Sequence, residues 1–326
     1  MADSQVLSAR EIVGTFYHAL EQGAHPWASK ISWRNGAANQ GLDVVEKYRW
    51  LGQAPTPREF IGGRQPKQLA AAGYDIRNKR WESSIYVPVL DWRKDKTGQI
   101  QVRIRDLARR YGVHIARLIS TLIVGGHNTL CYDGQYFFDT DHAEGASGSQ
   151  SNSISVDISA LPVSQHGSTT APSPAEFAYS ILLAIQQILS FADDTGEPMN
   201  EEARTFEVMV PTSLWVVALS AVGAQVLDGG ADNMVRIGTL NGLTINVHQN
   251  ARLNASWTAS FAVFRSDGDV KPFIYQEDGA DSAVNMKILG PDSEFALTND
   301  TCMVATDAIN NAGYGYWQHA CKVTLT

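Results

Sequence analysis

The most regular hydrophobic pattern in the chain covers residues 99–124. From Ile100 to Leu122, apolar side chains recur every three or four residues, which places them in one stripe along an α-helix. Gly125-Gly126 follows as a stop signal. The pattern predicts a single helix about 39 Å long, at ~1.5 Å per residue. The face opposite the stripe is rich in arginine and carries Arg103, Arg105, Arg109 and Arg110.

Shorter helical patterns occur near the N-terminus and in the middle of the chain. A four-residue apolar spacing predicts a short helix within residues 6–20. Ser173-Pro174-Ala175-Glu176 is a strong helix start, because Ser173 can cap the helix and Glu176 completes a capping box. Apolar residues then continue at helical spacing to Phe191.

Strand patterns dominate the last third of the chain. Strands are also predicted at Phe206–Val210 and within Tyr74–Leu90, where Pro88 indicates an edge or irregular strand. Helices and strands do not alternate regularly, so the sequence predicts an α+β fold and not a regular βαβ arrangement. The C-terminal strands are predicted at residues 243–248, 260–265, 272–276, 284–289, 302–306 and 315–325.

Two N-terminal segments lack a sustained period. Residues 1–46 have little apolar content of their own beyond the first helix, so we expect an arm that is ordered by the surface on which it lies. Residues 47–92 are broken by several Pro and Gly residues and are expected to form an extended excursion. Its basic side chains are Arg58, Arg64, Lys67, Arg77, Lys79 and Arg80.

The composition allows a sizeable hydrophobic core. The 326 residues are 44% hydrophobic and 18% charged. No apolar run reaches the ~18 residues that a membrane span needs. Cys131, Cys302 and Cys321 are odd in number and widely spaced, so neither a disulfide framework nor a zinc site is predicted.

Charge is divided unevenly along the chain. Residues 44–110 hold 15 of the 26 Lys and Arg but 7 of the 34 Asp and Glu, whereas residues 111–326 hold 8 basic and 23 acidic residues. Copies with one cationic and one anionic part attract one another head to tail, and such contacts build rings or lattices. Self-assembly is therefore the first hypothesis. A nucleic-acid-binding protein that uses the basic 44–110 face is the rival hypothesis.

The densest polar cluster lies between Asp133 and Glu144. Its four carboxylates and His142 are ligand types for a hard cation, although their spacing does not match an EF-hand loop. We favour a solvated loop with side-chain-stabilised turns, and keep two alternatives. These are a Ca²⁺ or Mg²⁺ site and a metal-dependent enzyme built on Asp133, Asp139, Asp141 and His142.

Known catalytic motifs do not occur in the sequence. The chain contains no HExxH, GxSxG, P-loop or dinucleotide-binding pattern. No nucleophile has an obvious base beside it in the sequence. We therefore predict no catalytic residue, no metal, no cofactor and no enzymatic activity.

Three segments, in order along the chain, resemble one family. They are YRWLG at residues 48–52 with PTPREFIG at 55–62, CYDGQYFFD at 131–139 followed by His142, and AGYGYWQ at 312–318. They are similar to segments of the Mu-like phage major head subunit (gpT) family. The resemblance implies the tailed-phage, Hong Kong-type major capsid fold.

The parts of that fold can be placed along this sequence by the resemblance. Residues 1–46 correspond to an N-terminal arm and residues 47–85 to an extended loop. Residues 86–164 and 286–326 correspond to a peripheral domain, with a spine helix at about 99–124. Residues 165–285 correspond to an axial domain.

The resemblance also implies a function. The chain is expected to be a major capsid protein whose hexamers and pentamers form an icosahedral head shell around double-stranded phage DNA. Its expected partners are further copies of itself, portal, scaffold, decoration or minor capsid proteins, and the packaged DNA without sequence specificity. It would assemble in the bacterial host cytoplasm and reside in the virion capsid. An encapsulin-type compartment of the same fold stays open as an alternative.

A cationic loop that meets anionic neighbours would set the direction and register of subunit contacts. The resemblance implies a shell in which the extended loop lies on a neighbouring subunit, so its basic side chains are candidates for such contacts. The alternative is that they only keep the loop solvated. The arginines of the long helix either bridge subunits or face DNA. The candidate inter-subunit residues are Arg58, Arg64, Lys67, Arg77, Arg80, Arg103, Arg109 and Arg110.

Overall fold

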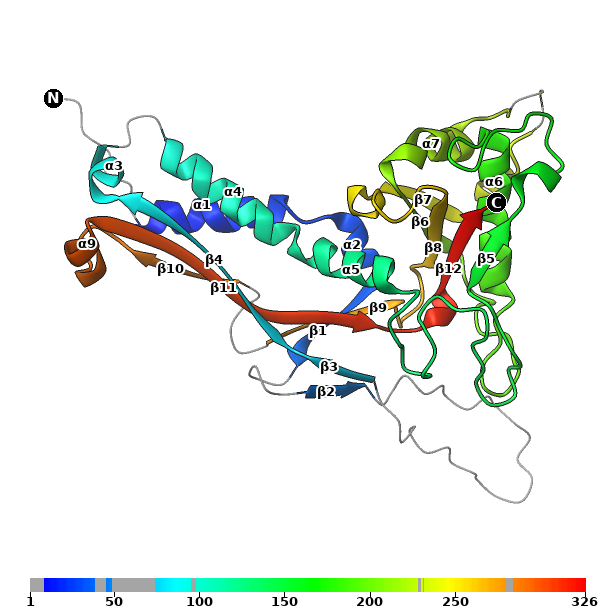
Figure 1. The fold of residues 1–326 in the computed structure, drawn as a ribbon, viewed down its shortest axis with the longest axis horizontal. Helices are drawn as coiled ribbons and strands as arrows, with labels where there is room; N and C mark the ends of the chain where they lie inside the picture. The colour runs from blue at the N-terminus through cyan, green and yellow to red at the C-terminus, as the bar shows by residue number, and fades with distance from the viewer. Residues whose placement is uncertain are drawn as a thin grey trace, which may run out of the picture.

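Two five-stranded β-sheets at opposite ends of an elongated molecule organise the fold (Figure 1). Strand β11 (Thr301–Tyr314) runs along the molecule, from the end that holds helix α9 (Glu294–Asn299) toward the second sheet. None of the helices in the described part of the chain is long and apolar enough to cross a membrane. The computed structural model describes residues 9–38, 45–48, 74–94, 98–227, 230, 232–278 and 284–326.

The first sheet is built on the long antiparallel pairing of β11 with β4 (Lys79–Pro88). Their register is continuous, from Asn310 opposite Lys79 to Thr301 opposite Pro88. Buried residues alternate with partly exposed ones along most of β11, which is the pattern of a strand with one covered face. Among the described strands β4 pairs with β11 alone, and a proline is tolerated at such an edge. The sheet is completed by β10 (Asn285–Leu289), β9 (Phe273–Asp278) and β1 (Ser32–Ala38), and β1 runs parallel to β9.

Helices α1 (Ala9–Gln22) and α4 (Gln99–Gly112) cover the buried face of this sheet. Phe16 of α1 and Ile104 of α4 are wholly buried and share a core with Val304 of β11. The two helices cross closely where α1 ends. A Cβ at Gly112 would lie 2.7 Å from the backbone of Gly23, so this crossing requires glycine. At the outer end of the sheet, α3 (Val89–Lys94) follows β4 directly and buries Trp92 in the same core.

The helix predicted over residues 99–124 is divided into two. α4 ends at Gly112, and α5 (His114–Gly125) begins one residue after Val113, whose φ and ψ are −84° and 0°. The apolar stripe continues through both helices, but its two halves pack into different hydrophobic cores. Leu107 packs with α1 and the first sheet, whereas Ile119 packs in the core of the second sheet. Each half meets its own partner, and the interruption at Val113 marks where the stripe passes from one core to the other.

The second sheet has its own helical layer. Its strand order is β5-β12-β8-β6-β7, with β5 parallel to β12 and β6 parallel to β7. α6 packs against β8 and β12, and Phe177 of α6 lies 4.6 Å, centroid to centroid, from Phe261 of β8. α7 and α8 lie beside α6. The bounds are β5 Ser153–Val156, β6 Thr205–Val210, β7 Thr244–Gln249, β8 Ser260–Arg265, β12 Ala320–Leu325, α6 Pro174–Leu189, α7 Trp215–Gly223 and α8 Met234–Leu240.

The predicted start of α6 is confirmed. The Ser173 hydroxyl accepts a hydrogen bond from the Glu176 amide, and the Glu176 carboxylate accepts one from the Ser173 amide. The Glu176 carboxylate also accepts the Gly167 amide and contacts His166. Two orphan donors of the helix start are thus satisfied, and the preceding loop is tied to the helix.

Residues 9–38 of the segment predicted as an arm pack on their own chain. Besides α1, they form α2 (Pro26–Ile31) and the strand β1 of the first sheet. Lys30 of α2 lies 3.3 Å from Glu207 of β6, whose side chain is fully buried. The segment therefore joins both halves of the subunit.

The strand pairings cross the domain boundaries that were expected from the sequence. β5 and β12 come from the ranges assigned to the peripheral domain, yet they share a sheet with β6, β7 and β8 of the axial range. β9 of the axial range lies in the first sheet. Strands adjacent in space here are distant in sequence, so contiguous ranges do not separate the two sheets. The extended loop is represented by β2 (Val45–Tyr48), β3 (Tyr74–Arg77) and the start of β4, because residues 49–73 lie outside the described part.

Candidate functional site

The cationic candidates divide between residues that the structure describes and residues that it does not. Arg58, Arg64 and Lys67 lie outside the described ranges. Arg77 ends β3, is exposed, and accepts a hydrogen bond on its backbone oxygen from the Asn311 side chain at 2.7 Å. The structure thus locates five of the eight candidates, namely Arg77, Arg80, Arg103, Arg109 and Arg110.

Arg80 has an acidic partner within its own chain. Its guanidinium lies 3.6 Å from the Asp307 carboxylate on the neighbouring strand β11. Asp307 is also 2.9 Å from Lys287 of β10. Both cations are more than half exposed, so each pair contributes at most about 1 kcal/mol to stability. Arg80, Asp307 and Lys287 thus form a solvent-exposed row of ion pairs across β4, β11 and β10.

The arginine face of α4 is exposed. The helix buries its apolar stripe in the first core, which turns the arginines toward solvent. Arg110 forms an ion pair with Asp106 one turn earlier, at 3.1 Å. Within the described ranges, Arg103, Arg105 and Arg109 form no ion pair. These three side chains are therefore available for contact with another molecule.

A pocket with a volume of about 430 Å³ opens where α4 meets α5. We call it the arginine pocket, because Arg110, Arg117 and Arg252 line it. Arg252 reaches it from η5 (Ala251–Leu253), a 3₁₀ helix after β7. Its wall includes Trp81 of β4, whose ring lies 4.7 Å from that of His114, centroid to centroid.

A second pocket, of about 380 Å³, has mostly acidic residues among its charged lining. Glu201, Glu202 and Asp269 line it together with Asp267, which forms an ion pair with Arg265 at 2.7 Å. Asp267 also accepts the backbone amides of residues 204 and 205, and these bonds with Arg265 lower its pKa despite partial burial. Asp267 therefore keeps its negative charge to a lower pH than an unperturbed aspartate.

Helix α7 exposes an apolar surface. Its sequence WVVALSAVG is apolar on nearly all sides, and a helix of that kind is normally buried. Yet Val216 is 69% exposed, Leu219 45% and Trp215 40%. Two more apolar side chains are exposed nearby in the chain. Val226, between α7 and α8, is 53% exposed, and Met234, the first residue of α8, is 57% exposed. We call these five residues the apolar α7–α8 face.

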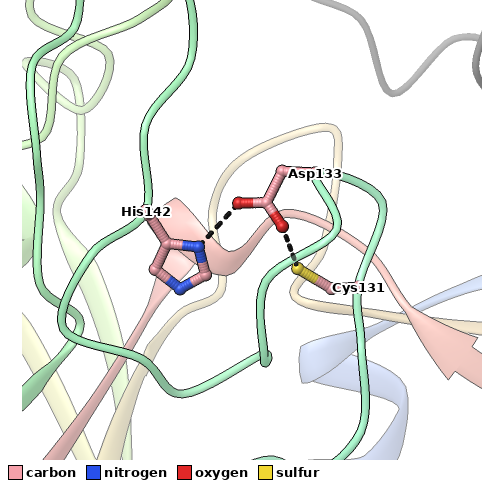
Figure 2. A group of neighbouring side chains, drawn as sticks. All are labelled: Cys131, Asp133 and His142. Carbon is pink, nitrogen blue, oxygen red and sulfur yellow. Dashed lines mark hydrogen bonds and ion pairs between the residues drawn. The ribbon is translucent and has the colours of Figure 1, made fainter.

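The Asp133–Glu144 loop brings together a different set of residues from the one predicted. Figure 2 shows Asp133 between His142 and Cys131. His142 Nδ1 lies 2.6 Å from one carboxylate oxygen, and the Cys131 thiol donates to the other at 2.9 Å. The His142 ring stacks on Trp317 at 3.9 Å. Asp139 instead accepts the amides of residues 136 and 140, and Asp141 is exposed.

The ligand types in this cluster are those of a metal site. Hydrogen bonds within it satisfy Asp133 and the Cys131 thiol, whereas His142 Nε2 is buried and has no hydrogen-bond partner among the described residues. Potential ligand atoms of Cys131, Asp133 and His142 lie within 4.8 Å of one another. Burial and the neighbouring Asp133 carboxylate raise the pKa of the Cys131 thiol, which is therefore held protonated. A protonated thiol is not a nucleophile. The cluster links the loop to Trp317 through hydrogen bonds and the stacking of His142. The four carboxylates of the alternative cation site do not converge, since among the described residues the group close enough to hold an ion consists of Cys131, Asp133 and His142.

Sequence reasoning missed two features of these surfaces. Cys131 was treated as a buried thiol of no particular role, although its position two residues before Asp133 was visible. The sequence predicts a helix that opens at Pro211-Thr212-Ser213 and runs through Ala221, but its apolar content on nearly all faces was not used as a signal of exposure to a partner. The arginine pocket had no sequence signal, because Trp81, Arg117 and Arg252 are far apart in the chain.

The fold is the Hong Kong-type fold of tailed-phage capsid subunits. The subunit of the bacteriophage JBD30 capsid, solved with minor capsid protein trimers on its surface, superposes with a TM-score of 0.52 at 23% identity, over 72% of this chain and 93% of that one. Residues 13–161 and 241–326 match the family described as Mu-like prophage major head subunit gpT. The chain belongs to this family.

Two curated relatives are described as a major head subunit and a major capsid protein. The Mu-like prophage FluMu major head subunit of Haemophilus influenzae is 39% identical over 109 residues, which is 33% of this chain and 35% of the relative. The major capsid protein of Escherichia phage Mu is 37% identical over 95 residues, or 29% of this chain and 31% of the relative. The matched segment thus spans 31–35% of each relative's length.

Proposed function

We propose that this chain is the major capsid protein of a Mu-like phage or prophage. Its copies would assemble as hexamers and pentamers into an icosahedral head shell around double-stranded DNA. Membership of the major head subunit family and the capsid fold support this function. The structural observation that carries self-assembly is the apolar α7–α8 face.

The apolar α7–α8 face fits a contact between copies. Exposed apolar side chains of this size are costly in water, at about 25 cal/mol per Å² of apolar surface, and are normally covered in the functional state. Among described residues, nothing in the same chain covers Val216 or Leu219. A head subunit meets further copies of itself at high local concentration, so a second copy is the molecule that we expect to cover this face. We therefore assign this face to subunit association.

The domain organisation proposed for the shell follows the sequence expectation. The axial part would contain α6, α7, α8 and most of the second sheet, and the peripheral part would contain α4, β4, β10 and β11. The 1–46 arm and the 47–85 loop would add contacts to neighbouring subunits. Arg58, Arg64 and Lys67 would contribute through the loop, and Arg77, Arg103 and Arg109 through exposed positions. Arg80 is the weaker candidate, since Asp307 of its own chain already balances it.

The partners proposed for this chain are those of a phage head. Further copies, a portal, a scaffold and minor capsid proteins would assemble with it, and DNA would be enclosed without sequence recognition. The trimers on the JBD30 capsid are the reason for including minor proteins. The chain would assemble in the bacterial cytoplasm and reside in the virion.

Electron microscopy of the purified chain, with its mass distribution in solution, tests this function. Closed shells, or rings of five and six subunits, are expected. Replacing Val216 and Leu219 with Asp should raise the concentration needed for assembly on the order of tenfold, because two buried contacts become charged. Leu297→Asp, at an 87% exposed site on α9, is the control outside the apolar α7–α8 face. A wild-type chain that stays monomeric at all concentrations, with scaffold supplied, would contradict the proposal.

A further inference from the structure

The arginine pocket concentrates positive charge. Three guanidinium groups approach it from different elements: Arg110 from α4, Arg117 from α5 and Arg252 from η5. Strand β4 closes one side with Trp81, whose indole nitrogen is used internally and donates to the Asn310 carbonyl at 3.1 Å. The aromatic wall reduces access of water to one side of the charges, which strengthens their attraction for an anion.

The charges in the arginine pocket are not balanced within the chain. Arg117 and Arg252 form no ion pair with any residue in the described ranges. Arg110 pairs with Asp106, but the two side chains are 75% and 53% exposed, so this bond is weak and exchangeable. Glu82 is the acidic side chain among the described lining residues. Burial lowers the pKa of His114, so its ring is neutral near pH 7 and does not add to the positive charge.

A complementary surface lies in the other half of the same subunit. Residues 118–203 contain no Lys or Arg and 11 Asp and Glu. Within this stretch the segment 197–202, between α6 and β6, exposes Glu197, Glu201 and Glu202. None of these three carboxylates forms an ion pair with a described residue.

The 197–202 segment is held in a defined shape. The Asp193 carboxylate accepts the amides of Thr195 and Glu197 at 2.8 and 3.0 Å. The Asn200 side chain, which is fully buried, donates to the carbonyls of Ile188 and Gln318. A rigid turn loses little conformational entropy when it binds, so it can present its carboxylates efficiently.

We propose that the arginine pocket of one copy receives the carboxylates of the 197–202 segment of a second copy. This inference rests on the proposed function, since it names one contact through which copies of the chain would associate. The pocket and the segment are different patches on one subunit, so the contact is head to tail and repeats around a ring. Charge complementarity would set its orientation, while the apolar α7–α8 face would supply apolar burial.

Charge reversal on each side tests the contact in the full-length chain. Changing Arg117 and Arg252 to Glu should raise the concentration required for assembly on the order of tenfold, because like charges would face each other. Changing Glu197, Glu201 and Glu202 to Lys should do the same. A chain that carries both sets of changes should assemble at close to the wild-type concentration. Arg117→Lys with Arg252→Lys should also assemble, since the charge is kept.

A mixture of the two reversed chains gives an independent readout. In an alternating ring each pocket would meet a segment of opposite charge, so an equimolar mixture should form even-membered rings at a concentration at which neither chain assembles alone. Arg93→Glu combined with Lys94→Glu on α3, at two exposed residues outside the pocket, changes the charge by the same amount as the Arg117 and Arg252 variant and should assemble normally. Far-ultraviolet circular dichroism and thermal unfolding would verify that each variant is folded.

The outcomes separate this contact from the proposed function. If the wild type assembles and both reversed chains assemble equally well, the contact is overturned and the capsid function stands. Failure of the doubly reversed chain and of the mixture, with all variants folded, also overturns it. If the Arg variant assembles normally but loses affinity for double-stranded DNA, the pocket serves phosphate instead. A wild type that never assembles overturns both proposals.

Discussion

The Asp133 carboxylate accepts hydrogen bonds from two side chains, the His142 ring and the Cys131 thiol. Burial alone would raise its pKa, but the hydrogen bonds from His142 and Cys131 outweigh burial and lower the pKa below the usual 3.8. The charged form therefore stabilises the folded chain. That stabilisation is complete above the unfolded pKa and is lost as the pH falls through the folded pKa.

Asp133→Asn is predicted to destabilise the subunit by about 1–3 kcal/mol, because an amide cannot accept from both donors. The variant should also lose less stability than the wild type between about pH 4 and pH 2. Thermal unfolding measured across that pH range checks both statements. Asp141→Asn is the control, since Asp141 is an exposed carboxylate of the same loop. Parallel pH profiles for Asp133→Asn and the wild type would refute the assignment.

Among the elements, the crossing of α1 and α4 is the most demanding contact. Gly112→Ala would place a Cβ 2.7 Å from the carbonyl oxygen of Leu20 and from the Gly23 backbone. Neither backbone can move without displacing its helix, so we predict a loss of about 1–3 kcal/mol. Gly14→Ala, in the exposed middle of α1 with open space around it, should instead stabilise by about 0.5–1 kcal/mol. Equal effects of the two changes in chemical denaturation would show that the crossing is looser than described.

Local sequence patterns predicted some helices and strands correctly and missed other features of the fold. The capping box at Ser173 and Glu176 was predictable because both partners lie within one turn of the helix that they start. The C-terminal strands were predicted at about their observed places, but β11 runs to Tyr314, beyond the predicted 302–306, and residues 317–319 of the predicted 315–325 strand form a 3₁₀ helix. The interruption at Val113 was not predictable, because the apolar spacing from Ile100 to Leu122 is unbroken. Which core each half of the stripe joins depends on residues far away in the sequence.

For the whole molecule, charge distribution should control how quickly copies associate. Raising salt from about 0.1 M to about 1 M shortens the Debye length from ~10 Å to ~3 Å. We predict that the initial rate of assembly, followed by light scattering, falls on the order of tenfold over this range. The apolar α7–α8 face should then keep the final assemblies stable, since apolar burial does not weaken with salt. An assembly rate independent of salt would contradict a charge-guided contact.

The sequence by itself determined the α+β class, the helix starts, the alternating strands and the family, because each depends on residues close together in the chain or on a motif kept in order. It also determined that basic and acidic residues separate along the chain. Only the tertiary structure decided which of these charges find partners. Arg80 meets Asp307 across two paired strands, whereas Arg117 and Arg252 are brought to one pocket and form no ion pair with any residue that the structure describes. Such pairings are set by packing between distant segments, and a linear charge pattern contains no information about that geometry.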